Sequence, residues 1–152
     1  MSFSVVFSFF FSIILANMVQ TFKSGSYCPH TETGVKLICT PTEYSRFQNV
    51  FSSPPPDLNA HSLLVAFYGQ ANSGGYSVEI TNATVHHSTK AIHVDVRYSS
   101  PPPGMMVTMA ITQPFHSVLI EKVDPTYQLK VTTTGHKPVK PPAGNGHSFA
   151  FM

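Results

Sequence analysis

Side chains that alternate between apolar and polar dominate the middle of the chain, a pattern typical of half-buried β-strands. In residues 76–81 every second side chain from Tyr76 onward is apolar, and in residues 92–98 every second side chain from Ile92 onward is apolar. Residues 63–68 form a nearly continuous apolar run, which predicts a strand buried on both faces and central in its sheet. A β-sheet is therefore expected as the main element of the fold.

The two alternating segments fit together as a hairpin that turns at residues 87–89. In that register Ile80 faces Val96 on the apolar side, and Glu79 faces Arg97 on the polar side. A cross-strand pair of opposite charges stabilises a hairpin by roughly 0.2–1 kcal/mol. One register thus satisfies both the core face and the charges.

Asn82 begins the triplet Asn-Ala-Thr, which is an acceptor signal for N-glycosylation. Val85 is out of phase with Ile80, so we expect a β-bulge within residues 82–84. Such a bulge would turn Asn82 from the core face towards water. Asn82 is therefore a candidate glycosylation site in a eukaryotic host.

A single helix is predicted where the period changes after Thr40. Thr40 is a candidate N-cap, Pro41 suits the first helical position, and Glu43 completes a capping box. Apolar side chains follow at helical spacing as far as Phe51, and the prolines of 54–56 end the helix. We expect its aromatic stripe to lie in the core.

Weaker strand patterns complete the predicted fold. They lie at residues 35–39, 106–111, 115–121 and 127–131. Together the elements predict an α+β fold, with a small, mainly antiparallel β-sheet that is sandwich-like or a partial barrel, and one short helix packed on it.

The two ends of the chain differ from its middle. Residues 1–16 are typical of a secretory signal peptide, because their apolar stretch is too short to span a bilayer comfortably; a retained membrane anchor and a buried strand are the alternatives. Residues 135–152 are rich in Pro and Gly, and we expect a disordered tail. The folded domain is then expected to span residues 22–134. We expect the protein to be secreted and to make no membrane contact after signal cleavage.

Charge is sparse and scattered. The chain has 9 Lys and Arg against 7 Asp and Glu, for a formal net charge of +2. The basic residues form no stripe that would follow a phosphate backbone, so nucleic acid is not expected as a partner.

Cys28 and Cys39 are the two cysteines of the chain. In an oxidising compartment such a pair is expected to form a disulfide, worth roughly 3 kcal/mol in the chain-entropy model. Zinc held by Cys28, His30 and Cys39 is the alternative, but it lacks a fourth ligand at conventional spacing.

The residue types for catalysis are not arranged in a known pattern. No serine lies in a strand-to-helix elbow, no glycine loop precedes a helix, and the carboxylates offer no evident acid–base pair. The chain has eight histidines, yet His86 and His87 point to opposite faces of one strand, which argues against a shared metal ion. We expect no enzyme activity, no metal and no cofactor.

Residues 67–80 (FYGQANSGGYSVEI), joined to 99–120 (SSPPPGMMVTMAITQPFHSVLI), resemble the PrcB C-terminal-like domain family. The likeness extends over roughly residues 22–122. Its most specific elements are Ser73, Gly74, Gly75 and Tyr76, and the run Pro101, Pro102, Pro103 and Gly104.

That family is known from secreted or lipid-anchored bacterial proteins, one of which associates with and stabilises a surface protease complex. The resemblance implies a secreted, non-catalytic interaction module whose partner is an extracellular protein, with a protease or a protein assembly as the candidates. It implies no catalytic residues, and this chain lacks the lipid-anchor cysteine. An inhibitor or a small-ligand-binding module that uses loops 69–75 and 100–104 is the alternative.

Overall fold

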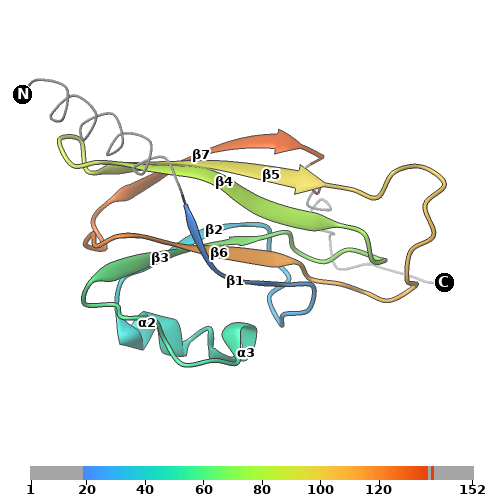
Figure 1. Cartoon of the computed structure of the whole chain (residues 1–152), viewed down its shortest axis with the longest axis horizontal. Helices are drawn as coiled ribbons and strands as arrows, with labels where there is room; N and C mark the ends of the chain where they lie inside the picture. Colours follow the sequence, from blue (N-terminus) through green and yellow to red (C-terminus); the bar gives the residue numbers. More distant parts are fainter. Residues whose placement is uncertain (1–18, 137, 139–152) are drawn as a thin grey trace, which may run out of the picture.

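The computed structural model describes residues 19–136 and 138, in which seven strands form two sheets packed face to face (Figure 1). The strands are β1 (Gln20–Gly25), β2 (Gly34–Ile38), β3 (His61–Phe67), β4 (Ser77–His86), β5 (Ala91–Ser99), β6 (Phe115–Glu121) and β7 (Gln128–Gly135). The larger sheet is antiparallel in the order β1-β6-β3-β2, and the smaller has the order β4-β5-β7. The expected small α+β fold is confirmed, as an open sandwich.

The larger sheet is buried on both faces because the smaller sheet covers one and the helices cover the other (Figure 1). Along β3 the side chains alternate between two cores. Leu64 and Ala66 face the smaller sheet, whereas Leu63, Val65 and Phe67 pack towards the helices. This double burial explains the continuous apolar run and confirms β3 as a central strand.

Two short helices, α2 (Pro41–Ser45) and α3 (Gln48–Phe51), stand in place of the single predicted helix. The capping box is present: the Thr40 hydroxyl accepts from the Glu43 N–H, and the Glu43 carboxylate accepts from the Thr40 N–H. The helix breaks at Phe47, whose ψ of 17° is not helical. Of the predicted aromatic stripe, Tyr44 and Phe51 are buried as expected, and Phe47 is half-buried.

The β4–β5 hairpin has the predicted register, with Ile80 opposite Val96 and Glu79 opposite Arg97. Arg97 also donates to the Glu79 carboxylate. The irregularity lies between Ile80 and Asn82, one residue earlier than the bulge predicted within residues 82–84. Pairing between these two neighbouring strands therefore sets the register of the hairpin.

Strand β7 pairs parallel to β5, which the mainly antiparallel prediction did not anticipate. The chain crosses from the larger to the smaller sheet through residues 122–127, so β7 starts beside Ala91 and ends beside Tyr98. At its far end the His136 N–H donates to the Tyr98 carbonyl at 3.2 Å.

The strand predicted at residues 106–111 is wrong. These residues lie in the long connection between β5 and β6, and Thr112 forms an isolated bridge with Ala71. Val107 is turned inwards against Gly75, but Met109 and Ile111, which the alternation places on the same face, are exposed.

The disulfide predicted between Cys28 and Cys39 is not formed, and both thiols are free and buried. Cys28 belongs to the core under the helices, and Cys39 belongs to the core between the sheets. The larger sheet therefore separates the two sulfur atoms. Burial raises the pKa of both thiols, so both are held in the protonated form.

The predicted signal peptide (1–16) and nearly all of the predicted tail (135–152) lie outside the described residues. Strand β1 begins at Gln20, slightly before the predicted domain boundary at residue 22. In the part of the chain that is described, no helix has the length and apolar character needed to cross a bilayer.

Candidate functional site

The two ends of the sandwich carry different groups of side chains, and the first end is formed by the connections 69–76 and 100–114. The Gly74 N–H donates to the Thr108 carbonyl at 2.9 Å, and Ala71 and Thr112 exchange two backbone hydrogen bonds of 2.8 and 2.9 Å. These bonds join the two predicted interaction loops into one surface.

Position 75 requires glycine for two reasons, its backbone conformation and the close packing around it. Its φ is +85°, where L side chains are strained. A Cβ atom there would stand 2.8 Å from the Pro101 Cβ and 3.0 Å from Val107 Cγ1. The Gly-Gly pair at the entry to β4 thus lets the 100–114 connection lie directly on the backbone.

The methionine loop (residues 104–111) presents apolar side chains to solvent from this braced connection. Met106 is 97% exposed and Met109 is 91% exposed. Met105 and Ile111 are 56% and 54% exposed. Sequence reasoning placed these side chains in a strand and missed them as a surface, although the chain has no Asp, Glu, Lys or Arg from residue 98 to residue 120.

Tyr76, predicted as an interaction residue, lies at the inner margin of this end. It is half-buried, and its ring centroid is 5.4 Å from that of Tyr68, which in turn contacts Tyr98 at 5.8 Å. Burial raises the pKa of the Tyr68 and Tyr98 hydroxyls. Tyr76 therefore closes the core, whereas Pro102, Pro103 and Gly104 are exposed, as the prediction requires.

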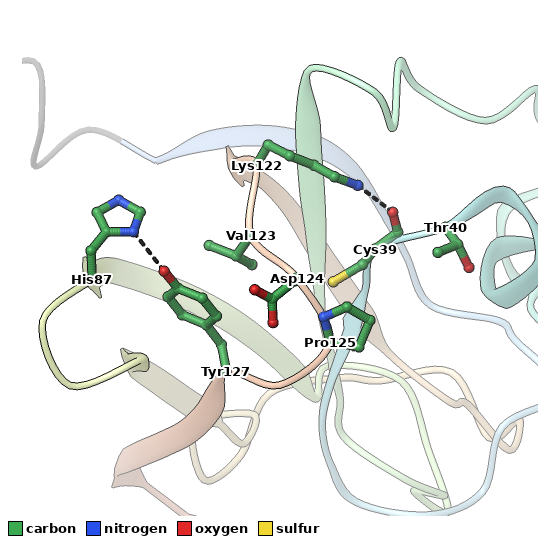
Figure 2. A pocket seen from close by; sticks show the side chains of 8 residues that line it. All are labelled: Cys39, Thr40, His87, Lys122, Val123, Asp124, Pro125 and Tyr127. Carbon is green, nitrogen blue, oxygen red and sulfur yellow. Dashed lines mark hydrogen bonds between the residues drawn. The ribbon is translucent and has the colours of Figure 1, made fainter.

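The opposite end of the sandwich holds an open pocket of about 320 Å³ (Figure 2). It lies where the link from β6 to β7 passes the end of β2 and the β4–β5 turn. Its walls combine ionisable and apolar side chains. They are Cys39, Thr40, His87, Lys122, Val123, Asp124, Pro125 and Tyr127.

His87 joins three elements at the mouth of this pocket. Its Nε2 lies 2.8 Å from Glu121 Oε1 at the end of β6, and its Nδ1 lies 2.7 Å from the Tyr127 hydroxyl, as Figure 2 shows for the latter pair. The side chains of His87 and Glu121 remain 58% and 57% exposed. Sequence reasoning did not predict this contact between His87 and Glu121, because 34 residues separate them.

The remaining charges of the pocket have fixed partners. The Lys122 ammonium donates to the carbonyls of Cys39 and Leu58, the latter at 2.6 Å. Hydrogen bonds from the Thr126 hydroxyl and N–H lower the pKa of the Asp124 carboxyl, so this wall of the pocket is anionic at neutral pH.

Comparison with known proteins gives one match. Residues 62–121 fit the family model described as PrcB C-terminal. The match supports a PrcB C-terminal-like domain over this segment. In the PrcB C-terminal domain the match runs from β3 to β6, which includes the methionine loop and both His87 and Glu121, but it ends before Tyr127. No curated protein and no solved structure matches the chain.

Asn82, the predicted glycosylation site of the PrcB C-terminal domain, is half-buried at the bulge. Its amide nitrogen lies 3.5 Å from Asp95 Oδ2, and its carbonyl oxygen is buried without a hydrogen-bond partner. Attachment of a glycan there stays a prediction.

The histidines of the hairpin do not assemble into a metal site. His86 and His93 face each other with ring centroids 4.7 Å apart, while His87 is held by Glu121 and Tyr127. Among residues 19–136 and 138, no group of three His, Cys, Asp or Glu side chains could hold a metal ion.

Proposed function

We propose that this PrcB C-terminal domain is a secreted, non-catalytic module that binds an extracellular protein through its methionine loop. Secretion rests on the signal-peptide pattern of residues 1–16. The family resemblance suggests a protease or a protein assembly as the partner. The observation that carries the proposal is the exposure of Met106 and Met109.

Burying these side chains would stabilise a complex substantially. A fully buried methionine contributes about 1.5–3 kcal/mol relative to an exposed one. Met106 and Met109 are 97% and 91% exposed, so nearly all of that gain is still available. The unbranched, polarisable methionine side chain also adapts to the shape of a partner surface.

The bracing of the loop supports the same reading. Hydrogen bonds at Gly74–Thr108 and Ala71–Thr112 fix the backbone on both sides of Met109. A further bond runs from the Thr112 hydroxyl to the Ser73 carbonyl at 2.8 Å. A contact segment that is ordered before binding loses less conformational entropy on association, which raises affinity.

The absence of charge indicates the kind of partner. A loop that inserts into a lipid surface is normally flanked by Lys or Arg, which bind anionic headgroups. Residues 98–120 contain none, and Arg97, which directly precedes them, is paired with Glu79. An apolar groove on another protein requires no such charges, and it would cover Met106 and Met109 together.

Photo-crosslinking of the secreted full-length chain tests the proposal. A photoreactive methionine analogue at positions 106 and 109 should join the chain to one other protein, with the bond mapped to these residues. Met106→Glu with Met109→Glu should abolish recovery of that protein, because a buried carboxylate is strongly disfavoured. Thr132→Glu, an exposed change on β7, serves as the matched control and should leave recovery unchanged.

Three results would contradict the proposal. They are crosslinks to lipid, crosslinks to a second copy of the chain alone, and recovery that survives the double glutamate variant.

A further inference from the structure

A carboxylate, an imidazole and a phenol form a continuous hydrogen-bonded chain at the pocket mouth. Glu121 Oε1 is 2.8 Å from His87 Nε2, and His87 Nδ1 is 2.7 Å from the Tyr127 hydroxyl oxygen. The three side chains come from the end of β6, the β4–β5 turn and the approach to β7. The order acid–base–hydroxyl is the arrangement that activates a side-chain nucleophile.

The carboxylate decides which way each hydrogen bond runs. An ionised Glu121 can only accept, so Nε2 of a neutral His87 must carry the proton. Nδ1 then has a free lone pair, and the Tyr127 hydroxyl donates to it. The phenol proton is thus already directed at the base that would remove it, and Glu121 would stabilise the imidazolium that results.

The surroundings hold the phenol in place and leave room for a second molecule. The Tyr127 ring packs against the core between the sheets and meets the His87 ring edge-on at 5.8 Å. The pocket of about 320 Å³ lies directly beside it (Figure 2). Asp124 and Lys122 place one negative and one positive charge on the pocket, so a neutral reagent suits it better than a charged one.

We propose that Tyr127 is a nucleophile that accepts an acyl group from a small neutral ester bound in this pocket. The Tyr127 oxygen forms a bond to the acyl carbon, and the bond from that carbon to the ester's leaving oxygen breaks, so the alkoxide or phenoxide departs with the electron pair. The phenol proton moves to His87 Nδ1, and the imidazolium later loses a proton to water. The transfer is stoichiometric and independent of binding through the methionine loop.

Acetylation of the full-length chain by p-nitrophenyl acetate tests this assignment, with peptide mass mapping to locate each acetyl group. Tyr27 is the matched internal control, because it is 64% exposed and therefore more accessible than the half-buried Tyr127. A positioned general base typically contributes 10²–10⁴-fold, and for an open site we expect Tyr127 to react at least about tenfold faster than Tyr27.

Variants separate the base from mere accessibility. His87→Ala should lower labelling of Tyr127 to the rate of Tyr27, and added imidazole should restore it, which a purely structural role of His87 would not allow. Glu121→Gln should give an intermediate rate. All three side chains are at least partly exposed, so thermal melts should show that the variants still fold.

The proposal is overturned if Tyr127 and Tyr27 react at equal rates. It is also overturned if His87→Ala leaves labelling of Tyr127 unchanged, or if acetyl groups are found on lysines or Cys39 alone.

Discussion

The two ends of this sandwich are ordered by opposite means. At the methionine-loop end, backbone hydrogen bonds hold the two connections together, and Gly75 allows them to pack closely because it has no side chain. Residues 98–120 include no charged residue. At the pocket end, side chains supply the bonds: Ser62, His87 and Lys122 each join separate segments. One end therefore presents an apolar surface, and the other presents ionisable groups.

This contrast follows from the length and charge of the connections between the strands at each end. The same sheets end in both places, but the 100–114 connection is long and uncharged, whereas the 122–127 link is short and carries Lys122 and Asp124. The sandwich core lies between the two ends, so a substitution at one end should leave the structure of the other end unchanged. A substitution that adds a side chain should destabilise the methionine-loop end most, and one that removes a side chain should destabilise the pocket end most.

The largest expected effect is that of Gly75→Val. A left-handed backbone costs an ordinary residue about 1–2 kcal/mol, and overpacking against Pro101 and Val107 adds about 1–3 kcal/mol. Thermal unfolding should show the loss as a lower Tm. Gly104→Val is the matched control, because Gly104 has a φ of +81° but no atom within 4 Å of its built Cβ. Equal losses in the two variants would show that packing under the loop contributes nothing.

Ser62→Ala should have the next largest effect, at the pocket end. The buried Ser62 hydroxyl donates to the Val123 carbonyl and accepts from the Val123 N–H, both at 3.1 Å. Its removal leaves buried backbone groups without partners, which costs about 1–3 kcal/mol. Urea unfolding should show this loss, and Ser88→Ala in the exposed turn should show none. A Ser62→Ala midpoint equal to that of the parent would refute the side-chain anchoring of this end.

A smaller, pH-dependent effect is expected from His116 at the methionine-loop end. Burial lowers its pKa, against a weaker opposing influence of Glu79, and its Nδ1 accepts from the Ile80 N–H at 3.0 Å. The unfolded chain therefore binds the proton more readily, and stability should fall as the pH drops below about 6.5. His116→Asn keeps an acceptor for Ile80 but does not titrate, so its free energy of unfolding should depend less on pH. An unchanged slope between pH 7 and pH 5 would contradict this role.

A reducing agent should have no effect on stability. Cys28 donates to the Gln113 carbonyl beside the loop end, whereas Cys39 lines the pocket, so no covalent bond links the two ends. Intact mass should show two free thiols, and Tm should be equal with and without dithiothreitol. A mass lower by two hydrogens, with a Tm that falls on reduction, would instead indicate a disulfide worth roughly 3 kcal/mol.

The elements that sequence reasoning predicted correctly depend on near neighbours. The capping box at Thr40 and Glu43 lies within four residues, and the β4–β5 register follows from one short turn. Alternation and charge pairing then suffice, because the same few contacts decide both pattern and structure.

The elements that were missed depend on contacts between distant segments. Strand β1 pairs with β6 across 90 residues or more, and β7 pairs with β5 through a crossover that no local sequence pattern predicts. The pocket combines residues 39–40 and residues 122–125 with His87 and Tyr127, and Glu121 meets His87 beside it, so neither Glu121 nor Tyr127 could be matched to the histidine in advance. The two cysteines are close in sequence, yet a sheet lies between them.

The parallel placement of β7 also decides how the molecule can be tethered. Strand β7 finishes beside Tyr98, next to the start of the 100–114 connection, whereas β1 starts beside Leu119 near the pocket. A label or fused domain joined after His136 would crowd the apolar contact surface. The same label joined ahead of Gln20 would lie at the pocket end and leave the methionine loop free for its partner.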